Sequence, residues 1–181
     1  MRLFVAIEIS AEIRQRINDF VTLLQPRLTN ARWVRPEGLH ITLKFLGNVA
    51  DERLPVIESA LRRIAASHFE LSLQNVAVFP NPGSPRVLWV GIESGPELAT
   101  LANEADNALT SIGFERERRA FTPHVTLARF KEGSKTQNIS SALKESNPHF
   151  GRMTATEFHL YESKLSPKGA SYRKLASFAL N

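Results

Sequence analysis

Two short segments of this 181-residue chain carry the same pair of imidazole and hydroxyl side chains, His-Ile-Thr-Leu at 40–43 and His-Val-Thr-Leu at 124–127. On a strand, alternate residues point to opposite faces, so each histidine shares a face with the threonine two positions later. Opening a cyclic phosphodiester requires one group that takes a proton from water and one that delivers a proton to the leaving oxygen. Histidine can do either near neutral pH, because its ordinary pKa is about 6.5.

The threonines complete this predicted site. A hydroxyl can donate a hydrogen bond to a non-bridging phosphate oxygen, where negative charge is concentrated during the transfer. We therefore predict that His40 and His124 form an acid–base pair and that Thr42 and Thr126 bind the phosphate, in a reaction that needs no metal. The residues themselves do not reveal which ring starts protonated.

An internal repeat relates the two motifs. Adding 84 to a residue number superimposes them, and it also maps Arg2 onto Arg86 and Ser10 onto Ser94. Each half of the chain then reads as a strand, a helix and a motif strand. This order predicts two similar lobes related by a pseudo-twofold axis, with the motif strands near 40–46 and 124–130 facing one another across a cleft. Both lobes belong to one domain over residues 1–181.

Hydrophobic spacing predicts the remaining elements. Apolar residues at steps of three and four indicate a helix that begins after an N-cap at Ser10, and another that begins at Ser94 and ends at Gly113. A third helix is expected over 51–66, with Asp51 as its N-cap. The segment 131–150 is polar and is expected to be a loop with a short helix near 139–146. Strands are expected at 2–9, 32–35, 40–46, 70–79, 86–93, 124–130, 154–164 and 171–180.

Basic and aromatic residues near the motifs are candidates for a substrate groove. Lys44 shares the expected face of Thr42, whereas Arg129 would reach that face only if a bulge or twist re-aims it. Arg119 belongs to a charged run that could follow the phosphates, and Phe121 could stack on a base. Each of these four has an alternative interpretation as a solvated or packing residue.

Other aromatic and histidine side chains are expected to have structural roles. Trp33, Phe45, Trp89 and Tyr161 are more typical of a core than of a base-stacking surface. The remaining histidines, at 68, 149 and 159, have no partner motif and are expected at the surface or in ordinary sheet packing. The sequence shows no zinc-binding His-Glu-x-x-His, no Walker loop and no dinucleotide fingerprint, so we expect neither metal nor cofactor.

Composition limits the class of protein. The chain has no cysteine and a formal net charge of +5, which favours a reducing cytoplasm and a polyanionic partner. The first apolar run is too short for a signal peptide, and no stretch approaches the roughly 18 apolar residues of a membrane-spanning helix. We expect a cytoplasmic monomer that does not enter membranes.

The blocks HITLKFLG and FTPHVTLARF, with the opening MRLFVAIEI and the closing FHLYESKL, resemble the RNA 2',3'-cyclic phosphodiesterases, also called the 2'-5' RNA ligase family, of the two-histidine phosphoesterases. This resemblance implies an α+β fold with two lobes, antiparallel sheets around a basic groove and helices on the outside. It also implies hydrolysis of terminal RNA 2',3'-cyclic phosphate, or of nucleotides that carry it, to a 2'-phosphate. His40 would then be the proton donor and His124 the proton acceptor.

Three alternatives remain open from the sequence. The reverse reaction, 2'-5' ligation of RNA ends, shares the transition state of hydrolysis. A phosphodiesterase of small cyclic nucleotides would differ only outside the phosphate pocket. A non-catalytic module that binds single-stranded RNA would explain the positive charge but would not need two matched imidazoles.

Overall fold

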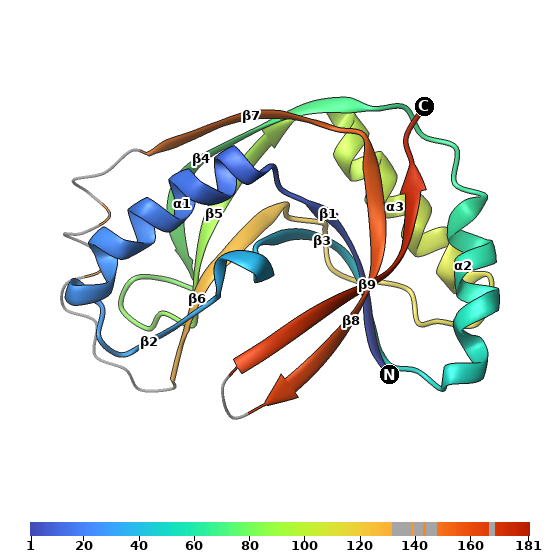
Figure 1. The fold of residues 1–181 in the computed structure, drawn as a ribbon, viewed down its shortest axis with the longest axis horizontal. Coiled ribbons are helices and arrows are strands. Elements are labelled where there is room, and N and C mark those ends of the chain that lie inside the picture. Colours follow the sequence, from blue (N-terminus) through green and yellow to red (C-terminus); the bar gives the residue numbers. More distant parts are fainter. Residues whose placement is uncertain (132–138, 140–142, 144–147, 167–168) are drawn as a thin grey trace.

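A computed structural model describes residues 1–131, 139, 143, 148–166 and 169–181 (Figure 1). Its central feature is one curled antiparallel sheet of nine strands in the order β7-β4-β5-β6-β3-β1-β8-β9, with β2 also paired to β6. The first strands are β1 (Arg2–Glu8), β2 (Ala31–Trp33), β3 (His40–Asn48), β4 (Phe69–Phe79) and β5 (Val87–Ser94). The later ones are β6 (His124–Phe130), β7 (His149–Ala155), β8 (Glu157–Ser166) and β9 (Gly169–Ala179).

The two motif strands, β3 and β6, lie side by side at the centre of this sheet. They pair antiparallel, with Ile41 opposite Val125. On one side of them follow β1, β8 and β9, and on the other follow β5, β4 and β7. We call β3-β1-β8-β9 the first half-sheet and β6-β5-β4-β7 the second half-sheet. The expected α+β fold with antiparallel sheets is confirmed, but the motif strands adjoin each other instead of facing one another across a cleft.

Two helices each follow a strand of one half-sheet but pack on the other half-sheet. Helix α1 (Ala11–Leu24) follows β1 but packs on β7 of the second half-sheet, where Phe20 and Phe150 meet edge to face at 5.4 Å. Helix α3 (Pro96–Thr110) follows β5 but packs behind β3, next to α2 (Leu54–Arg62). Figure 1 shows α1 on one side of the molecule and α2 and α3 on the other.

The core lies on the helix-covered face of the sheet. The apolar residues of both motifs, Ile41, Leu43, Val125 and Leu127, are buried there. Burying a side chain of this size stabilises a protein by roughly 1.5–3 kcal/mol. The sheet is therefore held rigid from behind, and its opposite, concave face is left to carry the polar motif residues.

The predicted helix ends are partly correct. Ser10 caps α1, since its hydroxyl accepts a hydrogen bond from the Ile13 amide at 3.3 Å. The equivalent prediction for Ser94 is wrong, because the N-cap of α3 is Gly95 and no side chain caps it. Asp51 does not cap α2 either, since it begins a separate 3-10 turn, Asp51–Arg53. Gly113 has a φ of +94°, the left-handed conformation expected just beyond the end of a helix.

The polar segment before the last strands contains the largest error in the predicted elements. Strand β7 begins at His149, where a loop was expected, and pairs with β4 along Phe69–Gln74. The single strand expected over 154–164 is instead the end of β7, a corner at Thr156 and most of β8. The short helix expected near 139–146 falls mostly outside the described residues. No helix in the described ranges is long and apolar enough to cross a membrane.

Candidate active site

The register of β3 and β6 brings the two motifs together on the concave face. Continuing the pairing of Ile41 with Val125 places His40 opposite Thr126 and Thr42 opposite His124. All four side chains are partly buried, while their neighbours along each strand are buried in the core. The structure thus brings together the four residues that the sequence analysis selected, two from each half of the chain.

An aromatic cage encloses His40. The ring centroids of Phe4, Tyr172 and Tyr161 lie 4.7, 5.2 and 6.2 Å from that of the imidazole. The pKa of His40 is lowered to about 4, mainly by burial in this cage. Repulsion from His124 also lowers this pKa, and a backbone hydrogen bond with Gly38 opposes the shift. His40 is therefore neutral in the free protein at pH 7. The cage leaves no local pattern in the sequence, because its members come from β1, β8 and β9 and meet His40 only in the folded sheet.

We expect the imidazole of His40 to titrate near pH 4 in the free protein, as followed by NMR of its ring protons. Phe4→Ala admits water to the cage and should raise this pKa towards 6.5, since burial disfavours the charged ring. Saturating inorganic phosphate should raise it as well, because an adjacent anion favours the imidazolium. A midpoint near 6.5 in the free wild-type protein would contradict the cage as the cause of the shift.

His124 is held by a different contact. Its Nδ1 lies 2.8 Å from the carbonyl oxygen of Thr122. A carbonyl oxygen only accepts, so Nδ1 carries a proton and donates it, which leaves Nε2 as the ring nitrogen that can accept a proton. Trp89 flanks the ring with a centroid distance of 6.1 Å, edge to face. The geometry suits His124 for taking a proton from a bound water.

A β-bulge interrupts each motif strand at the leucine of its motif. Along β1, Ala6 pairs with Thr42 and Val5 pairs with Lys44, so Leu43 is skipped. Along β5, Trp89 pairs with Thr126 and Leu88 pairs with Ala128, so Leu127 is skipped in the same way. A bulge adds one residue to its strand and inverts the alternation of faces beyond it. Residues beyond each motif therefore point the opposite way from simple alternation.

The prediction for Lys44 is wrong for this reason. The bulge turns Lys44 away from the groove and into the core, where it is 8 % exposed. Its Nζ donates to Asp106 Oδ1 of α3 at 2.5 Å and to the Glu115 carbonyl oxygen at 2.7 Å. Burial alone would raise the pKa of Asp106, but the hydrogen bonds from Lys44 and from the Glu117 amide hold it below its ordinary value. Lys44 ties α3 to β3 and does not face a substrate.

The same inversion brings Phe45 and Arg129 to the concave face. Phe45 is 64 % exposed, and its ring is tilted against that of Phe4 with a centroid distance of 6.0 Å, so its expected place in the core is wrong. Arg129 is exposed, and its charge lowers the pKa of Tyr172, which burial raises overall. Because the ring of Tyr172 packs against His40, Arg129 lies near the two motif histidines. The sequence predicted that Arg129 would reach this face only if a bulge or twist re-aimed it, and the bulge at Leu127 does so.

The remaining candidates differ in position. Arg119 is exposed, and its amide donates to Glu117 Oε1 at 3.0 Å, whereas Phe121 is partly buried against the core. Among the described residues, no hydrogen bond, ion pair or ring contact joins either of them to the motif side chains. His68 and His149 are exposed, and Trp33 packs against the core. Over the described part of the chain, no three His, Asp or Glu side chains form a cluster that could hold a metal ion.

Comparison with known proteins gives one consistent result. The family model described as LigT like Phosphoesterase matches the chain twice, at residues 7–89 and 90–172. A protein of Archaeoglobus fulgidus named RNA 2',3'-cyclic phosphodiesterase is 38% identical over 98% of this chain and 99% of its own. A protein of Escherichia coli K12 with the same name is 33% identical, over 99% of this chain and 96% of its own.

Solved structures agree with the sequence relatives. The crystal structure of E. coli LigT in apo form matches with a TM-score of 0.82 and 31% identity, over 99% of this chain and 96% of that one. LigT complexed with 3'-AMP matches with a TM-score of 0.80 and 29% identity, covering 99% and 97% of the two chains. Since the family model spans nearly the whole chain and the concave face carries its paired motifs, the chain is an enzyme that belongs to the LigT-like phosphoesterases.

Proposed function

We propose that this enzyme hydrolyses terminal 2',3'-cyclic phosphates of RNA to 2'-phosphates, with His40 as proton donor and His124 as proton acceptor. The observation that carries the proposal is the register that places each imidazole opposite the threonine of the other motif. A phosphate between the strands would then meet one hydroxyl and one ring from each side. The names of the relatives supply the RNA substrate.

The proposed mechanism assigns one proton transfer to each ring. His124 Nε2 accepts a proton from water, since Nδ1 is occupied by the Thr122 carbonyl oxygen. His40 must donate a proton to the 3'-oxygen that leaves, so it has to be protonated when substrate is bound. The anionic phosphate raises its pKa from about 4 in the free protein. Binding of substrate thus charges the donor at the moment when it is needed.

Two further features belong to this proposal. The chain acts as a single domain of two duplicated lobes, which is supported by the two successive matches to one family model. It works as a monomer, and it works in the cytoplasm, a reducing compartment that suits a sequence without cysteine. Each lobe supplies one histidine and one threonine, so neither is expected to be active alone.

The direct test uses a 5'-labelled RNA oligomer that ends in 2',3'-cyclic phosphate, incubated with the purified enzyme in excess EDTA. We expect a product whose phosphate is resistant to a 3'-specific phosphatase, because the 3'-oxygen is the leaving group. An oligomer that is opened to a 3'-phosphate would contradict the assigned regiochemistry. Tight binding without turnover would favour the RNA-binding module, and joined oligomers in place of hydrolysed ones would favour the ligase.

A further inference from the structure

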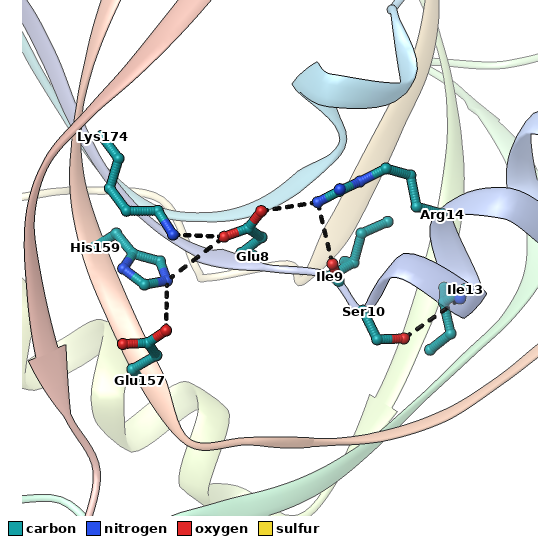
Figure 2. A network of polar contacts seen from close by, with 8 residues as sticks. All are labelled: Glu8, Ile9, Ser10, Ile13, Arg14, Glu157, His159 and Lys174. Carbon is teal, nitrogen blue, oxygen red and sulfur yellow. Dashed lines mark hydrogen bonds and ion pairs between the residues drawn. The ribbon is translucent and has the colours of Figure 1, made fainter.

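A second polar pocket lies on the concave face beyond His40. It occupies about 300 Å³ between the turn from β1 into α1 and the corner from β7 into β8. Its polar walls include Glu8, Arg14, Glu157 and His159. Figure 2 shows these side chains converging, with Lys174 of β9 reaching past β8 to Glu8 of β1. None of them belongs to the motifs.

This pocket shares a face with the acid–base pair. Glu8 of β1 pairs directly with His40 of β3, and His159 of β8 pairs with Ala6 of the same strand β1. Tyr161 connects the two regions, since its ring lies 6.2 Å from His40 and 5.7 Å from His159. Strands are about 4.8 Å apart in a sheet, so β8 lies about 10 Å from β3. The pocket is within reach of a substrate group attached to the bound phosphate.

The fold does not require these polar groups. The register of the second half-sheet places Gly91 opposite His124, where Glu8 stands opposite His40. The position equivalent to His159 is occupied by Ala77. Ala77 pairs with Trp89 of β5, just as His159 pairs with Ala6 of β1. The second half-sheet therefore forms with no ionisable group at either position.

One group in the pocket, the Glu157 carboxylate, remains available for a ligand. Glu8 is fully engaged, because its two oxygens accept from Arg14 at 2.9 Å and from Lys174 at 2.6 Å. Glu157, in contrast, has no hydrogen bond among the described residues, and its Oε1 lies 3.7 Å from His159 Nε2. His159 is 1 % exposed, and its Nδ1 is paired with Ser177 Oγ at 2.9 Å, which leaves Nε2 directed at the carboxylates.

We infer that this pocket is a second nucleoside subsite, which holds the base of the nucleotide preceding the cyclic phosphate through a hydrogen bond to Glu157. The inference rests on the proposed function and names the part of the RNA that reaches beyond the reacting phosphate. The Glu157 carboxylate accepts an N–H of the base, and the buried ring of His159 lies behind the carboxylate and positions it. Carboxylates read base amino groups in this way in other nucleic-acid complexes.

The chemistry of the pocket selects a base over the other parts of RNA. A phosphate is disfavoured, since two carboxylates line the walls and the cations Arg14 and Lys174 are already paired with Glu8. An aliphatic group would offer no hydrogen bond to the Glu157 carboxylate. The volume of about 300 Å³ is at the lower end of small-ligand sites, which suits a single nucleoside. The exposed Phe45 lies on the opposite side of Thr42, so it does not compete for this position.

The test measures the coupling between Glu157 and the preceding base. Three substrates with a 2',3'-cyclic phosphate are compared: the dinucleotide ApA, the same compound with an abasic first ribose, and the AMP mononucleotide. For wild type we expect kcat/KM to fall roughly tenfold when the first base is removed, the effect of one charge-assisted hydrogen bond. For Glu157→Ala we expect the same kcat/KM on ApA and on the dinucleotide that lacks the first base. Glu70→Ala, at an exposed glutamate of β4, is the matched control and should behave as wild type.

Each outcome separates the subsite from the proposed function. Equal base preference in wild type and Glu157→Ala would overturn the subsite, as would an equal loss on the mononucleotide and on ApA. Failure of the wild-type enzyme to open any of the three substrates would instead overturn the proposed function. Binding of ApA 2'-phosphate by calorimetry then tests the subsite without turnover. A Kd that Glu157→Ala weakens about tenfold supports the subsite, and an unchanged Kd refutes it.

Discussion

His124→Ala and His40→Ala each reduce kcat for opening an RNA 2',3'-cyclic phosphate by about 10²–10⁴-fold, the usual contribution of a positioned acid or base. In the proposed mechanism, His124→Ala removes the group that takes the proton from water, and His40→Ala removes the donor to the 3'-oxygen. Because the two transfers belong to one reaction, the double variant should lose little more than either single variant. Single-turnover rates on a cyclic-ended oligomer measure all three losses.

The matched control for this experiment is His149→Ala. His149 is exposed on β7, and its Nε2 contacts Ser72 Oγ at 3.3 Å, away from both motifs. Its loss should leave kcat unchanged, which shows that the effect does not come from removing any histidine. Circular dichroism of each variant establishes that the sheet is intact. Losses below about threefold in the two motif variants would exclude them as the acid–base pair.

Lys44→Met is expected to reduce stability by about 3 kcal/mol at pH 7, the typical cost of leaving one member of a buried ion pair without its partner. The Asp106 carboxylate is 9 % exposed and would lose its strongest donor. The paired Asp106 has a lowered pKa, so the pair's contribution is complete above the ordinary Asp pKa and is lost as the pH falls through the lowered value. The difference between variant and wild type should therefore shrink below about pH 4. Urea unfolding at pH 7 and at low pH measures this difference in the free energy of unfolding.

Arg129→Met is the matched control. It removes one cation from motif strand β6, just as Lys44→Met removes one cation from motif strand β3. Arg129 is exposed on the concave face, so its loss should change stability by less than about 0.5 kcal/mol and raise KM for the RNA. The double variant Lys44→Met with Asp106→Leu should recover most of the stability, because replacing a buried pair by apolar groups is nearly neutral. Failure of this rescue would mean that Lys44 contributes through something other than its ion pair.

The motifs and the main elements could be predicted from sequence because they depend on local patterns. Alternation fixes the face of His40 and Thr42, and apolar spacing marks α1 and α3. Lys44 was misplaced because nothing in its own segment marks the bulge at Leu43, which arises from the pairing of β3 with β1. The edge strand β7 was missed, since its polar flank resembles a loop until β4 provides hydrogen-bond partners.

The pocket beyond His40 could not be predicted either. Glu8 and His159 are 151 positions apart in the chain, and only the adjacency of β1 and β8 brings them together. His159 was expected in ordinary sheet packing, which describes its burial but not the contact of its Nε2 with the Glu157 carboxylate at 3.7 Å. Residues that act through a contact between distant strands leave no periodic signal in the sequence, whereas a repeated motif does.

The exchange of helices between the half-sheets makes the two halves of the chain interdependent in folding. Helix α1 covers strands that are synthesised after it, and the strands β8 and β9 that complete the first half-sheet come last of all. A nascent chain that ends before β9 therefore has no complete core to bury, and local unfolding of one half exposes the other. Unfolding is then cooperative across the whole chain, and an enzyme with two duplicated halves behaves as one thermodynamic unit.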